Sequence, residues 1–285
     1  MSMLLRTLLF LPLAFNLFPA DNGWTTPFPA HQVVGNVYYV GSAGLASYLI
    51  TTDKGHILIN SNLESSPALI AKSVEALGFK FSDVKIMLIS HAHWDHTAGS
   101  AVIKRLTNAK FMVMGPDVPV IEDGGQSDFQ YGGDASTHYK AAHVDRVLKD
   151  GDQVQLGDTV LTAHLTAGHT RGCTTWTLEV LENGKAQQVV IVGSPNANEG
   201  YQLVKNTRYP AIAEDFKRTF ATLKALPCDV FLGAHGDYYN LATKFPLLHN
   251  GGRNPFIDPA GYKAYVQNRE QAFLNELKKQ SALSQ

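Results

Sequence analysis

The junction between an almost wholly apolar run, Val84 to Ile89, and the segment Ser90-His91-Ala92-His93-Trp94-Asp95-His96 restricts the fold more than any other part of the sequence. Only Lys85 interrupts the apolar run, as expected of a strand that is buried on both faces of its sheet. The polar segment follows without a linker, so its side chains must lie where a buried strand ends. The sequence therefore predicts a covered sheet that carries a polar site at one edge.

Short apolar strands and medium helices alternate along the rest of the chain. Further strands are predicted at Val33 to Val40, Ser47 to Thr51, His56 to Ile59, Phe111 to Met114, Val154 to Leu156, Val160 to Leu165, Cys173 to Val180, Val189 to Val192 and Asp229 to Leu232. Helices are predicted after Ser65 or Ser66 (with Ile70, Val74 and Leu77 on one face), around Val102, Ile103 and Leu106, around Ile212, Phe216, Phe220 and Leu223, and from about Pro259. Two strand-rich halves, each with helices, indicate two sheets packed face to face with helices outside.

The charge balance excludes one class of partner. The 285 residues include 24 Lys and Arg against 25 Asp and Glu, a formal net charge of −1, so there is no basic surface of the kind that nucleic acid requires. With 45% hydrophobic and 17% charged residues, the composition is that of a compact soluble protein. A strand-rich chain of this length can close as a single domain, which we expect to span residues 21–285.

The N-terminus reads as an export signal. Arg6 is the only charged residue before Asp21, and Leu8 to Phe18 is an apolar segment too short to cross a membrane. Residues 1–20 are therefore predicted to be a signal peptide that is removed, which places the mature protein of a bacterium in the periplasm, with no membrane segment. A buried N-terminal helix is the alternative.

The segment after the buried strand offers four side chains that bind metal ions. His91 and His93 are two residues apart in extended chain, so their imidazoles lie on the same side and can hold one ion. Asp95 and His96 follow where the chain turns toward a helix, and can face a second ion. Zinc accepts imidazole nitrogen and carboxylate oxygen, and catalytic zinc keeps an open position for water. The alternative is a set of surface histidines beside a turn.

Two further histidines follow predicted strands and are flanked by glycine. His169 lies in Gly168-His169-Thr170-Arg171-Gly172, and His235 lies in Gly233-Ala234-His235-Gly236. Glycine allows the backbone to bring an imidazole into a crowded site. The other six histidines lack this context and are expected to be solvent-facing or satisfied in the core: His31, His56, His138, His143, His164 and His249.

Two other features of the sequence bear on the site. Residues Gly115 to His143 form a long polar excursion with few aliphatic residues, and such a segment inside a compact domain is usually functional, so we expect it to roof the site. The chain has two cysteines, Cys173 and Cys228, which either pair with each other or are buried thiols. Burial is the interpretation we favour for Cys228.

At these residues the chain resembles the metallo-β-lactamase superfamily, and within it the third subclass of class B enzymes, which has histidine in place of a cysteine ligand. The supporting stretches are His91 to His96, Gly168 to Trp176, Gly200 to Leu203, Arg208 to Pro210 leading to Asp215-Phe216, and Asp258-Pro259 with Tyr262 to Tyr265. The resemblance implies an α+β fold, an αββα sandwich of two mixed β-sheets with helices outside. It covers about Pro27 to Leu277.

The resemblance also implies a centre with two Zn²⁺ ions per chain. It gives His91, His93 and His169 to the first zinc and Asp95, His96 and His235 to the second. It further implies hydrolysis of the β-lactam amide of penicillins, cephalosporins and carbapenems by a metal-bound hydroxide, and hence antibiotic resistance. The partner is then a small β-lactam, and we expect the enzyme to be a monomer.

The roles of four polar residues stay open between two interpretations each. Asp95 either acts only as a ligand or also takes part in catalysis, by orienting the hydroxide or passing a proton to the leaving nitrogen. Ser194, Asn196 and Asn198 follow the strand at Val189 to Val192 and either bind substrate by hydrogen bonds or form an ordinary polar turn.

Three other functions compete with this prediction. A glyoxalase-II-like thioesterase or a lactonase of the same superfamily would add an aspartate that bridges both metals, where this chain has Ser194. A non-enzymatic periplasmic zinc protein would more often have a closed ligand set. A serine hydrolase is disfavoured because the sequence contains no Gly-x-Ser-x-Gly elbow.

Overall fold

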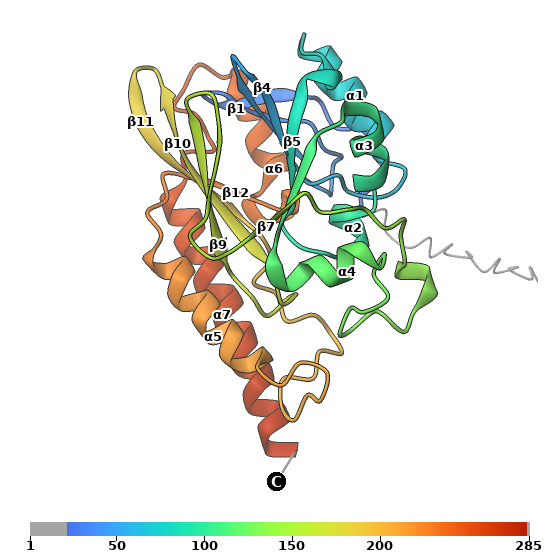
Figure 1. Cartoon of the computed structure of the whole chain (residues 1–285). Helices are drawn as coiled ribbons and strands as arrows, with labels where there is room; N and C mark the ends of the chain where they lie inside the picture. The colour runs from blue at the N-terminus through green and yellow to red at the C-terminus, as the bar shows by residue number, and fades with distance from the viewer. Residues whose placement is uncertain (1–21, 284–285) are drawn as a thin grey trace, which may run out of the picture.

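Two β-sheets lie face to face at the centre of the molecule, with helices on both outer sides (Figure 1). The structure is a computed structural model that describes residues 22–283. The predicted signal peptide, residues 1–20, lies outside the described residues. The predicted arrangement of two mixed sheets with helices outside is confirmed.

The first sheet has seven strands in the order of the sequence. They are β1 (His31–Val34), β2 (Val37–Tyr39), β3 (Tyr48–Thr52), β4 (Gly55–Ile59), β5 (Val84–Leu88), β6 (Lys110–Met114) and β7 (Arg146–Leu148). The strands from β1 to β4 pair antiparallel, whereas β4 to β7 pair parallel. The apolar run that precedes the histidine segment is thus β5, a central strand with neighbours on both sides.

The second sheet has five strands in the order β12, β11, β10, β9, β8. They are β8 (Gln153–Leu156), β9 (Thr159–Leu165), β10 (Thr174–Glu182), β11 (Lys185–Val192) and β12 (Val230–Gly233). Only β11 and β12 pair parallel, so both strands end at the same edge of the sheet. Side chains also join the two sheets: Trp176 of β10 donates a hydrogen bond to the carbonyl of Ile89 (3.0 Å), just beyond the end of β5.

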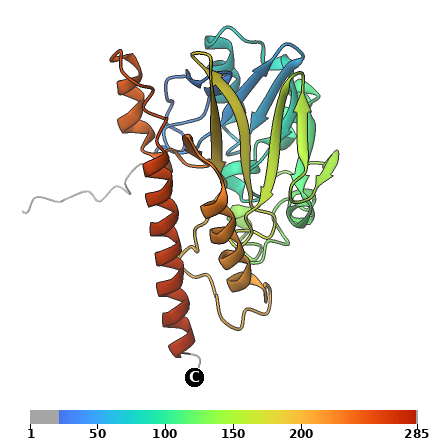
Figure 2. The ribbon, with the colours of Figure 1, turned by 90° about the vertical axis from the view of Figure 1, so that its left-hand side faces the viewer.

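Helices cover the outer face of each sheet. The first sheet is covered by α1 (Pro67–Ala76), α3 (Ser100–Thr107) and the short α4 (Val118–Glu122), and the second by α5 (Ile212–Ala225) and α7 (Pro259–Leu283). Two short helices, α2 (Trp94–Thr97) and α6 (Leu241–Lys244), complete the set of α-helices within residues 22–283. In Figure 2, α5 and α7 run side by side along one flank of the molecule. Their contact is aromatic, because Phe273 of α7 packs on Phe216 and Phe220 of α5 at ring distances of 5.1 and 5.7 Å.

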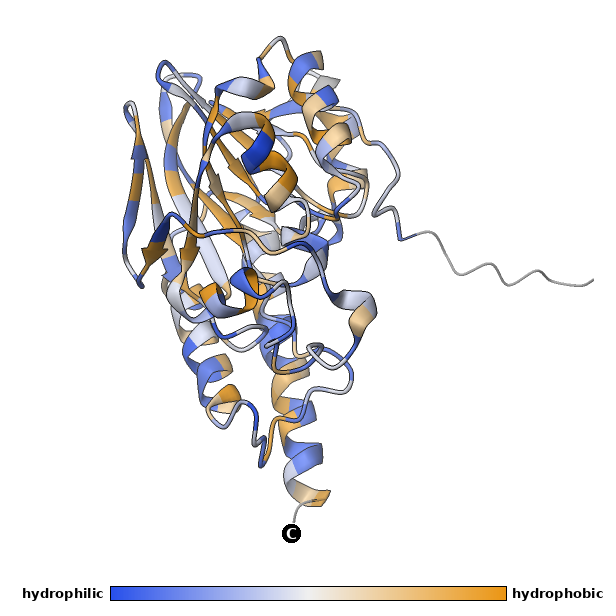
Figure 3. Ribbon diagram, turned by 45° about the vertical axis from the view of Figure 1, so that its right-hand side comes forward, coloured by the Kyte–Doolittle hydropathy of each residue, from blue (hydrophilic) through white to orange (hydrophobic). Residues whose placement is uncertain are grey.

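The core follows the hydrophobic pattern of the sequence. Hydrophobic residues gather along the strands that face another layer, and the outer helices alternate hydrophobic and hydrophilic residues (Figure 3). One buried cluster fills the space between the sheets and beneath α5 and α7, and the other lies between the first sheet and its helices. No helix between residues 22 and 283 combines the length and the apolar character that a membrane span needs.

The strands differ from the sequence predictions in two places. The single strand predicted at Val33 to Val40 is a hairpin of β1 and β2, because Gly35 adopts a positive φ of 48° and turns the chain. The strand β7 was not predicted, and two of its three residues are exposed.

Candidate metal centre

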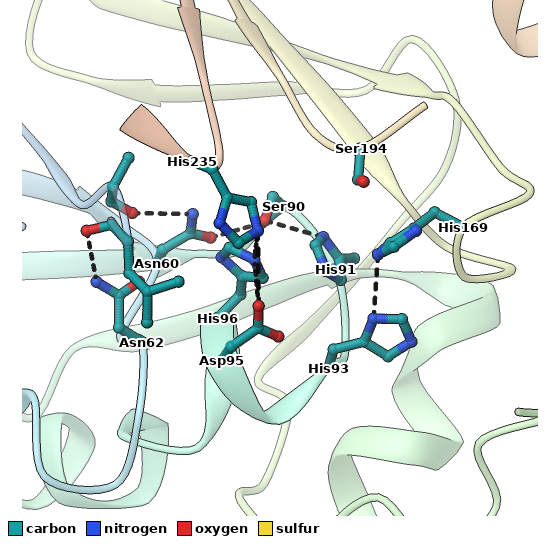
Figure 4. A network of polar contacts seen from close by, with 12 residues as sticks. Asn60, Asn62, Ser90, His91, His93, Asp95, His96, His169, Ser194 and His235 are labelled. Atoms are coloured by element: carbon teal, nitrogen blue, oxygen red, sulfur yellow. Dashed lines mark hydrogen bonds and ion pairs between the residues drawn. The ribbon is translucent and has the colours of Figure 1, made fainter. Parts of the chain in front are cut away.

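All six predicted ligand side chains converge at one edge of the sandwich (Figure 4). Four of them follow the end of β5: His91 and His93 lie in the connection from β5 to α2, and α2 carries Asp95 and His96. His169 lies in the connection between β9 and β10, and His235 lies two residues after the end of β12. Each sheet therefore supplies some of the six ligands. The ligands come together because each of them lies just beyond the end of a strand.

The first three ligands form a compact group. His91, His93 and His169 place one ligand atom each within 4.8 Å of one another, and all three side chains are buried. Nδ1 of His93 faces Nε2 of His169 at 3.1 Å. The ring of His91 lies 4.9 Å from that of His93 and 4.6 Å from that of His169.

The other three ligands form a second group beside the first. Oδ2 of Asp95 lies 3.1 Å from Nε2 of His96 and 3.6 Å from Nε2 of His235. The two Nε2 atoms are 3.0 Å apart. His91 connects the groups, because its ring lies 4.3 Å from the ring of His96 and because His91, Asp95 and His96 also have ligand atoms within 4.8 Å of one another.

The hydrogen bonds leave two ligand nitrogens of the first group available to bind a cation. Nδ1 of His169 lies 2.8 Å from the carbonyl oxygen of Asn196, which can only accept, so this nitrogen carries the proton and Nε2 is free to bind a cation. Nε2 of His91 is buried and has no hydrogen-bond partner. A buried nitrogen without a partner is costly unless something binds it, and a metal ion would satisfy both histidines. The residues therefore fit a divalent metal.

The electrostatics favour the same occupant. Burial and the neighbouring histidines lower the pKa of His91 and His169, and burial with His96 lowers the pKa of His235 to about 4. These imidazoles are neutral at pH 7 and available as ligands. Burial alone would raise the pKa of Asp95, but His96 and His235 hold it well below its usual range, so this residue is an anion.

The predicted roof, residues 115–143, carries groups that the sequence patterns did not single out as functional. Oδ2 of the buried Asp128 lies 3.6 Å from Nε2 of His93, and its Oδ1 accepts the backbone N–H groups of Gln130 and Tyr131. A carboxylate behind a ligand histidine orients the ring and raises its basicity. The ring of Tyr131 lies 5.0 Å from that of His93. The only signal in the sequence was the unusual length and polarity of this segment.

A cavity of about 410 Å³ opens beside the two groups. Its lining comprises Trp24, His93, Trp94, Asp95, Tyr131, His169, Asn196, Asn198, His235, Asp237 and Tyr238. Two of the predicted substrate-binding residues, Asn196 and Asn198, are among them, and Ser194 is not. Ser194 is buried, and its hydroxyl lies 3.1 Å from the hydroxyl of Tyr238. The side-chain amide of Asn196 donates a hydrogen bond to the same Tyr238 hydroxyl (2.8 Å).

His164 and the two cysteines lie outside this centre. His164, which is close to His169 in sequence, has its Nε2 2.8 Å from the Thr177 hydroxyl on the neighbouring strand. Cys173 is buried and Cys228 half-buried, and both are free thiols. The predicted burial of Cys228 is thus only partial.

The fold and the centre have clear counterparts among known proteins. The family profile described as the Metallo-beta-lactamase superfamily matches residues 44–235, so the chain belongs to that superfamily. The structure of the native FEZ-1 metallo-beta-lactamase from Legionella gormanii is 55% identical, with a TM-score of 0.89 over 90% of this chain and 98% of that one.

A second structure links the chain to class B3. The class B3 di-zinc metallo-beta-lactamase LRA-12 from an Alaskan soil metagenome is 32% identical, with a TM-score of 0.86 over 90% of this chain and 97% of that one. A curated relative, a probable metallo-hydrolase of Burkholderia pseudomallei, is 33% identical over 112 residues. That match spans 39% of this chain and 36% of the relative's length.

Proposed function

We propose that the chain is a zinc-dependent β-lactamase that hydrolyses the amide of penicillins, cephalosporins and carbapenems and so confers antibiotic resistance. One observation carries the proposal: His91, His93 and His169 face one another beside a second group of Asp95, His96 and His235. Its support from known proteins is the likeness to FEZ-1 and LRA-12, both named metallo-beta-lactamases.

The two groups would hold one zinc ion each. Neutral imidazoles and a single carboxylate suit zinc, and the di-zinc LRA-12 gives a precedent among similar structures. When bound, zinc lowers the pKa of water to about 7 and so supplies hydroxide at neutral pH without a separate general base.

Asp95 has a part beyond ligation in the proposed reaction. It is ionised at neutral pH, and it lines the cavity as well as facing His96 and His235. A carboxylate at this position can accept a hydrogen bond from the attacking nucleophile and carry a proton to the amide nitrogen when the ring opens. We assign both functions to Asp95.

The cavity walls supply substrate recognition in this proposal. Asn196 and Asn198 present amide groups to the cavity, and Tyr131, which bonds to Asn198 (3.0 Å), presents an aromatic ring. Trp24 and Trp94 add apolar surface for the substituents of the lactam. Ser194 acts indirectly, because its hydroxyl contacts that of Tyr238 rather than the cavity.

The proposal also includes the site of action. Residues 1–20 serve as a signal peptide, and residues 21–285 form a single domain that works in the periplasm as a monomer, on a small-molecule substrate and without nucleic-acid or membrane partners. The near-zero net charge supports the absence of a nucleic-acid partner.

The test is turnover of a chromogenic cephalosporin by purified mature protein, with chelator and after zinc is restored. We expect hydrolysis that chelator abolishes and zinc recovers, and turnover of a carbapenem in the same assay. If the zinc-loaded protein leaves the cephalosporin intact but rapidly cleaves a thioester or lactone, the alternative superfamily activity replaces the proposal. Asp95→Asn and His235→Ala should each lower the zinc content from two ions toward one, and an unchanged content would refute the second ligand group.

A further inference from the structure

A buried carboxylate, Asp117, lies behind the first ligand group and contacts none of its imidazoles directly. It ends the short 3₁₀ helix Gly115–Asp117 that follows β6, and it is only 1% exposed. Taking a carboxylate out of water costs free energy unless several donors compensate it. The donors that compensate Asp117 come from the two chain segments that carry the first three histidines.

One partner of Asp117 is the backbone between His91 and His93. The N–H of Ala92 donates to Oδ2 of Asp117 (3.0 Å), while the carbonyl of Ala92 accepts from the hydroxyl of Tyr139 (2.7 Å). Both polar groups of this residue are therefore fixed. Because the two histidines flank Ala92, this anchoring limits the freedom of both ligand side chains.

The other partners of Asp117 follow His169. The hydroxyl of Thr170 donates to Oδ2 and the N–H of Gly172 donates to Oδ1, both at 2.7 Å. The approach is so close that a Cβ atom on Gly172 would lie 2.7 Å from the side chain of Asp117, which explains a glycine at this position. One carboxylate thus joins the segment that follows β5 of the first sheet to the loop between β9 and β10 of the second sheet.

We propose that Asp117 is a positioning residue that holds His91, His93 and His169 in register for the first metal ion. The inference rests on the proposed function for its consequence in catalysis, but not for its effect on metal binding. Three short bonds from two separate loops fix the spacing of the ligand atoms before an ion arrives, and a preformed site binds more tightly than one that must be assembled. The negative charge of Asp117 close to the group also favours a bound cation.

The test compares Asp117→Asn with Asp145→Asn. The amide of the first variant keeps one acceptor oxygen and replaces the other by an NH2 group, so it cannot accept all three of the bonds that the carboxylate accepts. Asp145 is the control, since its carboxylate also accepts a backbone N–H, that of Phe111 (2.7 Å), and pairs with Lys104, but contacts neither ligand loop. The zinc affinities of the two sites are measured by competition with a chromophoric chelator. The visible absorption of the cobalt-substituted protein is recorded alongside.

We expect Asp117→Asn to weaken zinc binding by His91, His93 and His169 by about tenfold to a hundredfold and to alter the cobalt spectrum, with Asp145→Asn unchanged in both. A merely structural role would lower the melting temperature and leave the affinity and the spectrum alone, which would overturn the inference. If Asp117→Asn does not fold, Thr170→Val removes one bond only. It should then show a smaller loss of affinity, and wild-type affinity in that variant would also overturn the inference.

The outcome is separable from that of the proposed function. A wild-type protein that binds zinc but hydrolyses no β-lactam would refute the proposed function. The role of Asp117 in metal binding would then still be tested by comparing the zinc affinities of the wild type and Asp117→Asn. A wild-type protein that hydrolyses β-lactams, together with an Asp117→Asn variant of unchanged affinity, would refute the inference alone.

Discussion

The metal-free protein should lose stability on mild acidification because His235 is buried as a neutral base. Burial and the neighbouring His96 lower its pKa from 6.5 to about 4. Below about pH 6.5 the unfolded chain gains a proton that the folded protein does not take up, so the stabilising contribution is complete above that pH and is lost as the pH falls toward about 4. Between about pH 7.5 and about pH 5 this one residue accounts for a loss of about 2 kcal/mol.

Other groups titrate in the same interval, so the measurement needs a variant. The lowered pKa values of His91 and His169 add to the loss, whereas burial raises the pKa of Asp117 to about 6, which makes the folded protein gain stability as this carboxyl is protonated. Urea denaturation of chelator-treated wild type and His235→Asn at both pH values isolates the contribution of His235. We expect the wild type to lose about 2 kcal/mol more than the variant. Equal losses would show that His235 titrates normally in the fold, and the electrostatic description of the site would be wrong.

Three further predictions concern packing, backbone and metal. Phe216→Ala should lower the free energy of unfolding by about 3–5 kcal/mol in urea denaturation, because the ring is fully buried beneath α7, and a loss below about 1 kcal/mol would contradict that packing. Gly168→Ala should lower both zinc content and activity without changing the circular dichroism spectrum. Gly168 has a φ of 130° and a Cβ there would lie 2.7 Å from the ring of Phe216, so the substitution should displace the neighbouring His169. Full zinc content in this variant would refute the prediction. Zinc at about a hundred times its dissociation constant should stabilise the chelated protein by about 2.7 kcal/mol, and an unchanged melting temperature on zinc addition would argue against a metal centre.

The sequence allowed the ligand groups to be predicted because their signals are local. His91 to His96 directly follow a buried strand, and the glycines around His169 and His235 mark turns that bring an imidazole to a strand end. The structure places these segments at one edge, because the strands that precede them end there. The layered fold could be predicted for a similar reason. The apolar runs coincide with β3 to β6 and with β8 to β12, and most of the predicted strand ends lie within one or two residues of the observed ends.

The residues behind the ligands could not be predicted, because their positions depend on tertiary contacts. Asp117 and Asp128 lie in a polar stretch that the sequence predicts to roof the site, but its pattern does not indicate that these two side chains are buried against the histidine segments. Tyr238 likewise contacts Ser194 across 44 positions of sequence. The hairpin at Gly35-Asn36 could have been predicted, because this dipeptide is a turn signal. It was missed because apolar residues on both sides suggested one continuous strand.

The distribution of the ligands between the two sheets has a consequence for assembly. Neither half of the chain contains all three members of either group, since His169 and His235 belong to the second sheet and the other four ligands follow the first. An ion bound by either group would therefore cross-link the two sheets. When the metal is withdrawn, that cross-link is lost, and the buried cluster between the sheets is what still holds the two halves together.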